Sequence, residues 1–131
     1  MEYTNSDVRR QDRLLDEARA REIMATAEYG VMSMTDADGM AYGIPLNFVW
    51  DGNDCFYIHC APEGRKLRVI AENKNVSFCI VGKVDLKPQM FTTAYESVVL
   101  RGEASVVESD DERREALRLL VKKFSPEYET L

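Results

Sequence analysis

The stretch that decides the fold is Tyr42–Leu67, which reads YGIPLNFVWDGNDCFYIHCAPEGRKL. Two runs rich in β-branched and aromatic residues flank the turn Asp51–Asp54, and Ala61–Gly64 ends the second run. In the second run, apolar residues occupy both odd-numbered and even-numbered positions, as Phe56 and Tyr57 show. A strand with one solvent-exposed face would alternate apolar and polar residues instead. Both faces of this strand are therefore expected to be covered, as in a barrel.

Upstream of this stretch, the pattern predicts a helix and a hairpin. Asp16 is a plausible N-cap for a helix over 17–27, and Gly30 follows where a C′ residue would stand. Strands are expected over 31–35, 40–50 and 55–60, with a hairpin turn at Asp36–Gly39. These three antiparallel strands form a predicted meander, and residues 1–13 are a predicted flexible arm.

Downstream, helical spacing over 65–73 precedes a fourth strand, Val76–Val81. An irregular connection carrying Pro88 is expected over 82–90. The fifth strand is expected over 91–107 with a bend near Gly102, and an amphipathic helix over 110–124. The prediction is a single mainly β (α+β) domain over 1–131, an antiparallel barrel with flanking helices.

Composition excludes several function classes. Hydrophobic residues make up 45% of the 131 and charged residues 31%, a globular balance, and the net charge of −6 argues against a nucleic-acid partner. The longest apolar runs are five to six residues, and the N-terminus is polar, so neither a membrane span nor a secretory signal is expected. Cys55, Cys60 and Cys79 lack CxxC spacing and His59 is the sole histidine. We therefore expect buried free thiols, no metal site and a cytoplasmic location.

The turn before the second helix carries the clearest chemical signal. Gly64 leads into a helix that begins with Arg65 and Lys66. Free N–H groups at a helix N-terminus, with two cations beside them, suit a phosphate. A solvated basic turn is the alternative that these residues alone leave open. The sequence contains no Ser/His/Asp set, HExxH motif, Walker loop or GxGxxG motif.

Residues 42–67, followed by VSFCIVG at Val76–Gly82 and FTTAYESVVLRGEA at Phe91–Ala104, resemble the FMN-binding split-barrel family related to pyridoxamine 5′-phosphate oxidase. The resemblance covers roughly residues 12–128 and is nearest to the branch of nitroimidazole-resistance (Nim) flavoproteins. It implies a split antiparallel β-barrel of five or six strands, because relatives continue past Ser125–Tyr128 into a last strand. It also implies a homodimer with FMN at the interface, in two sites built from both subunits.

The resemblance further implies roles for individual residues. His59 and Cys60 would meet the ribityl-phosphate, Arg65 and Lys66 would bind the phosphate, and Ser97 would contact the flavin from a neighbouring strand. One strand would supply backbone contacts to the flavin ring and ribityl chain; it comprises Ile44, Pro45, Leu46, Asn47, Phe48 and Val49. The oxidase itself has Arg and Lys where Ile44 and Val49 stand, and this chain lacks its substrate-binding C-terminal segment. Pyridoxamine phosphate oxidase activity is therefore not expected.

The predicted function is an FMN-binding reductase that uses NAD(P)H to reduce small acceptors such as nitroimidazoles or quinones. His59 is a weak candidate for proton donation, with a structural histidine equally plausible, and Asn47 either contacts the ring or is satisfied by backbone. Phe48, Trp50 and Tyr95, with the partner's residues 83–93, are expected to line the acceptor cleft, although simple packing is favoured for Trp50. Lys83, Lys87 and Arg101 are expected to form a solvated face. The alternatives are a non-catalytic flavin-binding or sensing module, or a split barrel holding haem or deazaflavin; haem would need His59 or a cysteine as axial ligand.

Overall fold

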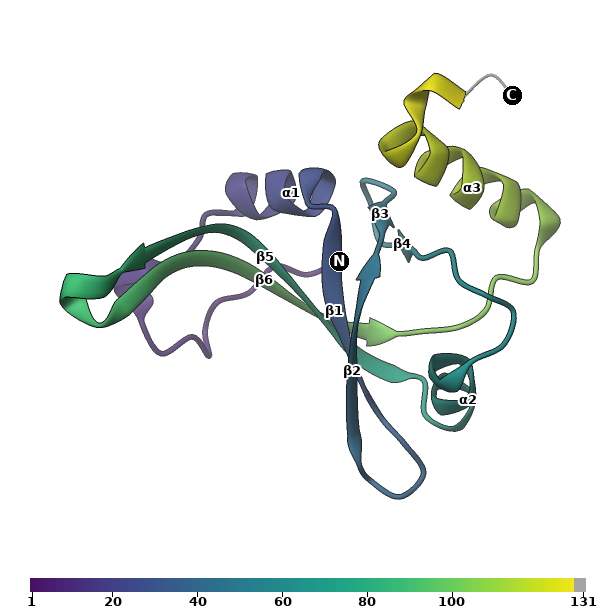
Figure 1. The fold of residues 1–131 in the computed structure, drawn as a ribbon, viewed down its shortest axis with the longest axis horizontal. Helices are drawn as coiled ribbons and strands as arrows, with labels where there is room; N and C mark the ends of the chain where they lie inside the picture. Colours follow the sequence, from purple (N-terminus) through teal and green to yellow (C-terminus); the bar gives the residue numbers. More distant parts are fainter. Residues whose placement is uncertain (129–131) are drawn as a thin grey trace.

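The computed structural model describes residues 1–128, and it contains six strands and three α-helices (Figure 1). The helices are α1 (Glu17–Thr26), α2 (Arg65–Glu72) and α3 (Asp110–Phe124). The strands are β1 (Tyr29–Thr35), β2 (Ala41–Asn47), β3 (Val49–Trp50), β4 (Phe56–Tyr57), β5 (Asn75–Lys87) and β6 (Thr92–Glu103). Short 3₁₀ turns lie at Gln11–Arg13, Pro88–Met90 and Pro126–Tyr128.

The strands form two sheets, and every pairing is antiparallel. One sheet has the order β2-β1-β5-β6 and the other pairs β3 with β4. Within residues 1–128 the sheets do not join into a closed barrel, so β2 and β6 remain edge strands. The strand count, the antiparallel pairing and the flanking helices confirm the predicted split-barrel fold class.

The helix predictions are confirmed nearly to the residue. The Asp16 side chain caps α1 by accepting a hydrogen bond of 2.7 Å from the backbone N–H of Arg19. The hairpin turn before β2 is also confirmed, with Gly39 at a φ of +80°. Gly30 is a correction: α1 ends at Thr26 with Ala27 as its C-cap, and Gly30 lies inside β1. There a Cβ would stand only 2.5 Å from the Phe78 ring, so close packing rather than a helix cap requires glycine.

Several strand boundaries were predicted wrongly. The run 40–50 is interrupted at Phe48 and splits into β2 and β3, while only Phe56–Tyr57 of the run 55–60 is strand. Most of the expected irregular connection 82–90 is strand, because a bulge between Val81 and Val84 lets β5 continue to Lys87. The fifth predicted strand ends at Glu103, and Gly102 pairs regularly with Val76.

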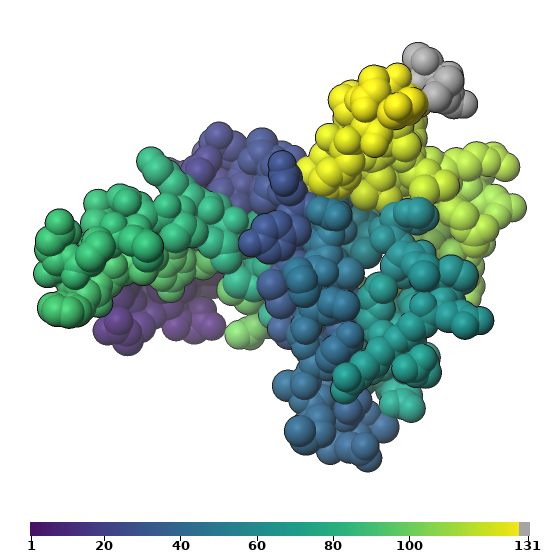
Figure 2. Space-filling view, viewed as in Figure 1, coloured from purple at the N-terminus to yellow at the C-terminus, as the bar shows by residue number. Residues whose placement is uncertain are grey.

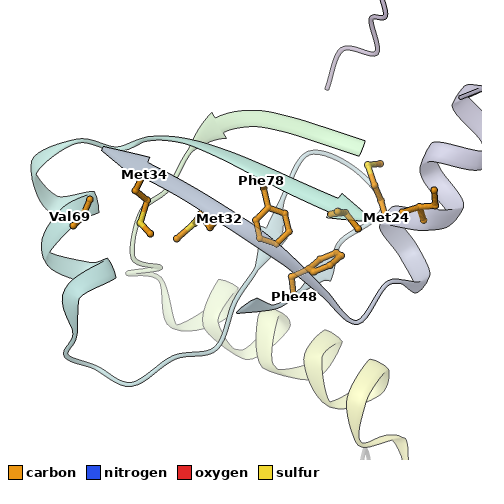
Figure 3. Packing of buried hydrophobic residues seen from close by; sticks show 8 residues of the cluster. Met24, Met32, Met34, Phe48, Val69 and Phe78 are labelled. Atoms are coloured by element: carbon orange, nitrogen blue, oxygen red, sulfur yellow. The ribbon is translucent and has the colours of Figure 1, made fainter. Parts of the chain in front are cut away.

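The core lies on one face of the large sheet, beneath α1, α2 and the small sheet (Figure 3). Its buried residues are Ile23, Met24, Met32, Met34, Phe48, Val69, Phe78 and Ile80. The ring of Phe48 is fully buried and meets Phe78 edge-on, with centroids 5.2 Å apart. Phe56 packs 5.8 Å from Phe48, so an aromatic cluster joins the two sheets.

The opposite face of the β5–β6 ribbon is apolar and exposed. Val84 pairs with Tyr95, so their side chains lie on the same face of the ribbon. Because side chains alternate between the two faces along a strand, residues two positions away lie on this face as well. Five of its large side chains, here called the open face, are 46% to 69% exposed: Val81, Val84, Leu86, Tyr95 and Val99. Figures 1 and 2 show this hairpin projecting to one side of the molecule, with the N-terminal segment alongside it. An apolar face of this size is typical of a surface that is covered by a partner.

Candidate functional site

A long groove of about 1800 Å³ runs between β6, the segment after β4, the start of α2 and one side of α3. His59, Cys60, Lys66 and Ser97 line it. Its walls also carry apolar side chains from the sheet and from β4, including Phe56, Ile58, Phe78, Val98 and Leu100. The structure therefore gathers four of the predicted site residues, from three parts of the chain, along one partly apolar groove.

Residues 1–10 lie along this groove rather than away from the molecule. The Tyr3 hydroxyl donates to the carbonyl of Leu15, and the Asp7 carboxylate lies 3.9 Å from the Arg101 guanidinium. The flexibility expected for this arm stays a prediction.

The N-terminus of α2 differs from the N-termini of α1 and α3. Helices α1 and α3 have side-chain caps, from Asp16 and Ser109, and acidic residues in their first turns. Gly64, at a φ of +151°, precedes α2; no side chain of the described residues caps this helix, and its first turn contains no acidic residue. The first hydrogen bond of this helix runs from the backbone N–H of Arg68 to the carbonyl of Gly64. The preceding N–H groups of the turn thus remain available to an anion.

The two cations of this turn point to different places. Lys66 is half-buried and lines the groove beside His59 and Cys60. Arg65 stacks on the other side of α2, with its guanidinium carbon 4.3 Å from the centre of the Tyr42 ring. Arg65 also borders a smaller hollow of about 300 Å³ beside Asp36 and Asp38. Of the predicted pair, only Lys66 lies with the other groove residues, and phosphate binding by either remains a prediction.

The predicted flavin strand lies at the edge of the large sheet. Ile44 and Leu46 turn toward the core, whereas Pro45 and Asn47 are exposed on the opposite face. None of the six residues 44–49 lines the groove formed by the described part of the chain. Because β2 is an edge strand, alternate backbone N–H and C=O groups face away from β1 and can meet a ligand. The Asn47 side chain donates a hydrogen bond of 2.9 Å to the Glu28 carbonyl. Of the two alternatives for Asn47, this is the one in which the backbone satisfies its side chain.

Two of the three aromatic residues expected to line a cleft are occupied by packing. Phe48 is fully buried, because the break between β2 and β3 turns it into the core, so its assignment as a cleft residue was wrong. Trp50 stacks on Phe56 and donates its indole N–H to the Asn53 carbonyl at 2.9 Å, which confirms simple packing. Tyr95 is exposed and lines the groove.

The sequence analysis did not single out Glu96, which lies between Tyr95 and Ser97. Its carboxylate accepts two hydrogen bonds from the Arg19 guanidinium, at 2.7 and 2.8 Å, and one from the Lys83 backbone N–H at 3.2 Å. The hydrogen bonds from Arg19 lower the pKa of Glu96 to about 2. Glu96 thereby ties α1 to β6 at the bulge and fixes the strand that carries Ser97. A carboxylate directly before the run Ser97–Leu100 of small and apolar residues was the available signal.

Lys123 was missed as well, and it anchors α3. Its ammonium group donates to the carbonyls of Ala27 and Phe48, at 2.5 and 2.9 Å, and lies 4.1 Å from the centre of the Phe48 ring. Partial burial lowers the pKa of Lys123. This contact holds the α3 wall of the groove against the sheets.

The cysteines and acidic residues form no metal site within residues 1–128. All three cysteines are free, but Cys55 is exposed and the other two are only partly covered, so the expectation of buried thiols was wrong. No helix in the same range is long and apolar enough to span a membrane.

Comparisons with known proteins place this fold in a family. A sequence model described as pyridoxamine 5′-phosphate oxidase matches residues 16–131. The structure of a candidate 5-nitroimidazole antibiotic resistance protein from Bacteroides thetaiotaomicron is 29% identical, with a TM-score of 0.73, over 86% of this chain and 68% of that one.

Two further structures share the fold at lower identity. The flavocytochrome of Azotobacter vinelandii is 22% identical, with a TM-score of 0.70, over 88% of this chain and 55% of that one. The haem storage protein of Vibrio cholerae is 20% identical, with a TM-score of 0.67, over 82% and 75%. No curated protein matches. Since the family model covers nearly the whole chain, this protein belongs to the pyridoxamine 5′-phosphate oxidase family.

Proposed function

We propose that this chain binds FMN in the groove as a homodimer, and that it reduces small acceptors such as nitroimidazoles or quinones with electrons from NAD(P)H. The observation that carries the proposal is the start of α2. The first turn of this helix has open N–H groups and no acidic residue, and Lys66 faces the groove that His59 and Cys60 also line. Such a donor set suits a phosphate monoester, and the apolar groove wall beside it suits a planar ring.

Each residue has a distinct part in this proposal. Lys66 and the α2 N–H groups hold the phosphate, and Cys60 lies beside the ribityl chain. Ser97 contacts the ring. His59 is exposed at the groove, where its imidazole can exchange a proton with a bound acceptor. The bound flavin supplies the hydride and electron chemistry, and the protein supplies position and electrostatics.

The second copy is proposed to cover the open face. The exposed apolar side chains of the open face and of the hairpin tip make such a surface unfavourable in water, and a second copy would bury it. Backbone groups of residues 44–47 lie on the β2 edge of the same sheet, where a neighbouring copy's flavin can reach them. The free, partly accessible thiols suit a reducing compartment, and we propose a cytoplasmic location.

The phosphate assignment is tested by single substitutions at α2. Lys66→Ala is expected to weaken FMN binding about tenfold, because one charge-assisted contact is lost. Arg65→Ala is expected to weaken it less, since that guanidinium stacks on Tyr42. Lys74→Ala is the matched control, because Lys74 is exposed and pairs only with Glu103 among the described residues. Equal affinities for all four proteins, measured by flavin fluorescence titration, would refute the assignment.

Catalysis is tested separately by anaerobic stopped-flow measurement of the flavin absorption band. Bleaching on addition of NADH or NADPH, followed by recovery on addition of a nitroimidazole or a quinone, is expected. If neither donor bleaches the band and dithionite-reduced protein is not reoxidised by these acceptors, the chain is a non-catalytic flavin-binding or sensing module. A Soret band in place of flavin bands in the purified protein would identify haem as the ligand.

A further inference from the structure

A bulge interrupts the pairing of β5 with β6 directly beside Ser97. Two residues of β5, Gly82 and Lys83, face the single residue Glu96 of β6, between the regular pairs on either side. A bulge bends its strand, increases the local twist and changes the direction in which nearby side chains point. Because Ser97 follows Glu96 in the chain, the geometry of the bulge decides where the Ser97 hydroxyl points.

The Glu96 carboxylate holds this bulge to α1. Its Oε1 atom accepts the backbone N–H of Lys83, a residue of the bulge itself, at 3.2 Å. The Arg19 guanidinium donates to both carboxylate oxygens, from Nη2 at 2.7 Å and from Nε at 2.8 Å. The side chains of Arg19 and Glu96 are only 34% and 25% exposed. A two-pronged pair between arginine and a carboxylate has a defined orientation, so Arg19 fixes the direction of the Glu96 side chain.

A second contact joins α1 to the same bulge. A Cβ atom at Gly82 would lie 2.9 and 3.1 Å from two carbon atoms of the Ile23 side chain, so α1 lies directly against the backbone there. Ile23 is buried in the core and cannot move aside freely. We call these four residues, Arg19, Ile23, Gly82 and Glu96, the clamp. The clamp holds the bulge by one polar and one apolar contact.

Ser97 lies on the opposite face of β6 from the clamp. The side chains of Glu96 and Val98 point toward α1 and the core, so Ser97 between them points to the other face, where it is half-buried. Ser97 and Glu96 line the groove formed by the described part of the chain, whereas Arg19 does not. Arg19 can therefore influence the groove only through Glu96 and the strand that carries it.

We propose that Arg19 and Glu96 are positioning residues for the flavin ring: by holding the bulge, they set the direction of the Ser97 hydroxyl toward the ring. This inference rests on the proposed FMN binding and names the residues that prepare the ring-binding part of that site. The hydroxyl is held in place before the ligand arrives, so binding does not have to order it. A weaker clamp leaves the bulge free to change its twist, and the hydrogen bond from Ser97 is then misdirected.

The test is a double-mutant cycle of Glu96→Gln and Ser97→Ala, measured by fluorescence titration with FMN and with riboflavin. Glutamine keeps the shape of the side chain but removes the charge and one of the two oxygens that Arg19 binds. Each single variant is expected to weaken the binding of both ligands about fivefold, because one hydrogen bond to the ring is lost or misdirected. The ratio of the two affinities is expected to stay unchanged, because the phosphate binds at α2. The double variant is expected to bind within about twofold of Ser97→Ala, because the clamp acts through Ser97.

Glu115→Gln is the matched control. The Glu115 carboxylate also accepts two hydrogen bonds from an arginine, Arg118, at 2.7 and 2.9 Å, but this pair lies within α3 and Glu115 does not line the groove of the described chain. Its flavin affinities are expected to equal those of the wild type. Arg19→Lys is the second variant, for use if Glu96→Gln does not fold. It keeps the cation but loses the two-pronged geometry, and it is expected to weaken both ligands in the same proportion.

Three results would overturn the positioning role while leaving flavin binding intact. The first is wild-type affinity in the folded clamp variants or in Ser97→Ala. The second is a double variant whose loss equals the product of the two single losses, since the clamp and Ser97 would then act independently. The third is a clamp variant that weakens FMN but not riboflavin. A wild-type protein that binds neither flavin would overturn the proposed function, and this inference with it.

Discussion

Gly30→Ala is expected to destabilise the protein through a single steric contact. An added Cβ would lie 2.5 and 2.6 Å from two atoms of the Phe78 ring and 3.1 Å from the Cys79 carbonyl oxygen. Phe78 cannot simply move, since its ring packs against Phe48 at 5.2 Å and Phe56 at 6.3 Å. Overpacking of this kind costs about 1–3 kcal/mol. The lower entropy of the unfolded chain returns at most about 1 kcal/mol, so we expect a net loss of about 1–2 kcal/mol.

Gly102→Ala provides the matched control in the same sheet. Its added Cβ would meet no heavy atom of the described residues within 4 Å, so we expect no loss and a gain of up to about 1 kcal/mol. With a slope near 2 kcal/mol per molar urea, the two unfolding midpoints should differ by about 1 M. Equal midpoints would refute the reasoning. Phe78→Leu should also reduce the cost of Gly30→Ala, because the clashing ring atoms are then absent.

Three further predictions concern hydrogen bonds and titration. Because Arg19 lowers the pKa of Glu96 to about 2, the stability contribution of Glu96 is present above about pH 4.5 and is lost as the pH falls toward 2; the melting temperatures of wild type and Glu96→Gln should therefore converge in that range. Ser109→Ala removes the cap of α3 and should lower stability by about 1 kcal/mol in urea unfolding. Burial raises the pKa of Tyr57 to about 12, so Tyr57→Phe should remove the last tyrosinate step in an ultraviolet pH titration, and an unchanged last step would contradict this assignment.

The helices could be predicted from the sequence because their signals are local. Asp16 stands directly before a stripe of apolar residues with helical spacing, where an N-cap is expected. Gly64 stands directly before Arg65, at the point where the strand end leads into a helix. The extended β5 could not be predicted in this way. Gly82 and Pro88 indicate a break, but the bulge is held by Glu96, whose partner Arg19 lies 77 positions away in the chain. Only the tertiary structure brings them together.

The sequence indicated which residues would gather at the candidate site more clearly than it indicated how their side chains would be oriented. The order of strand, glycine turn and cations brings His59, Cys60 and Lys66 to one groove, and their contacts with a cofactor stay a prediction. Adjacent residues of a helix point about 100° apart, so the separation of Arg65 from Lys66 is local geometry, and the packing of α2 against Tyr42 decides which of them faces the groove. The inward turn of Phe48 likewise depends on packing against Phe78 from a distant strand.

The central claim is that a phosphate-bearing flavin binds at the start of α2, and a comparison of FMN with riboflavin tests it most directly. The two ligands share the ring and ribityl chain and differ only in the phosphate. Several charge-assisted contacts at α2 predict that the wild type binds FMN at least about 100-fold more tightly than riboflavin in equilibrium fluorescence titrations. Equal affinity for the two ligands, or no binding of FMN, would contradict the account.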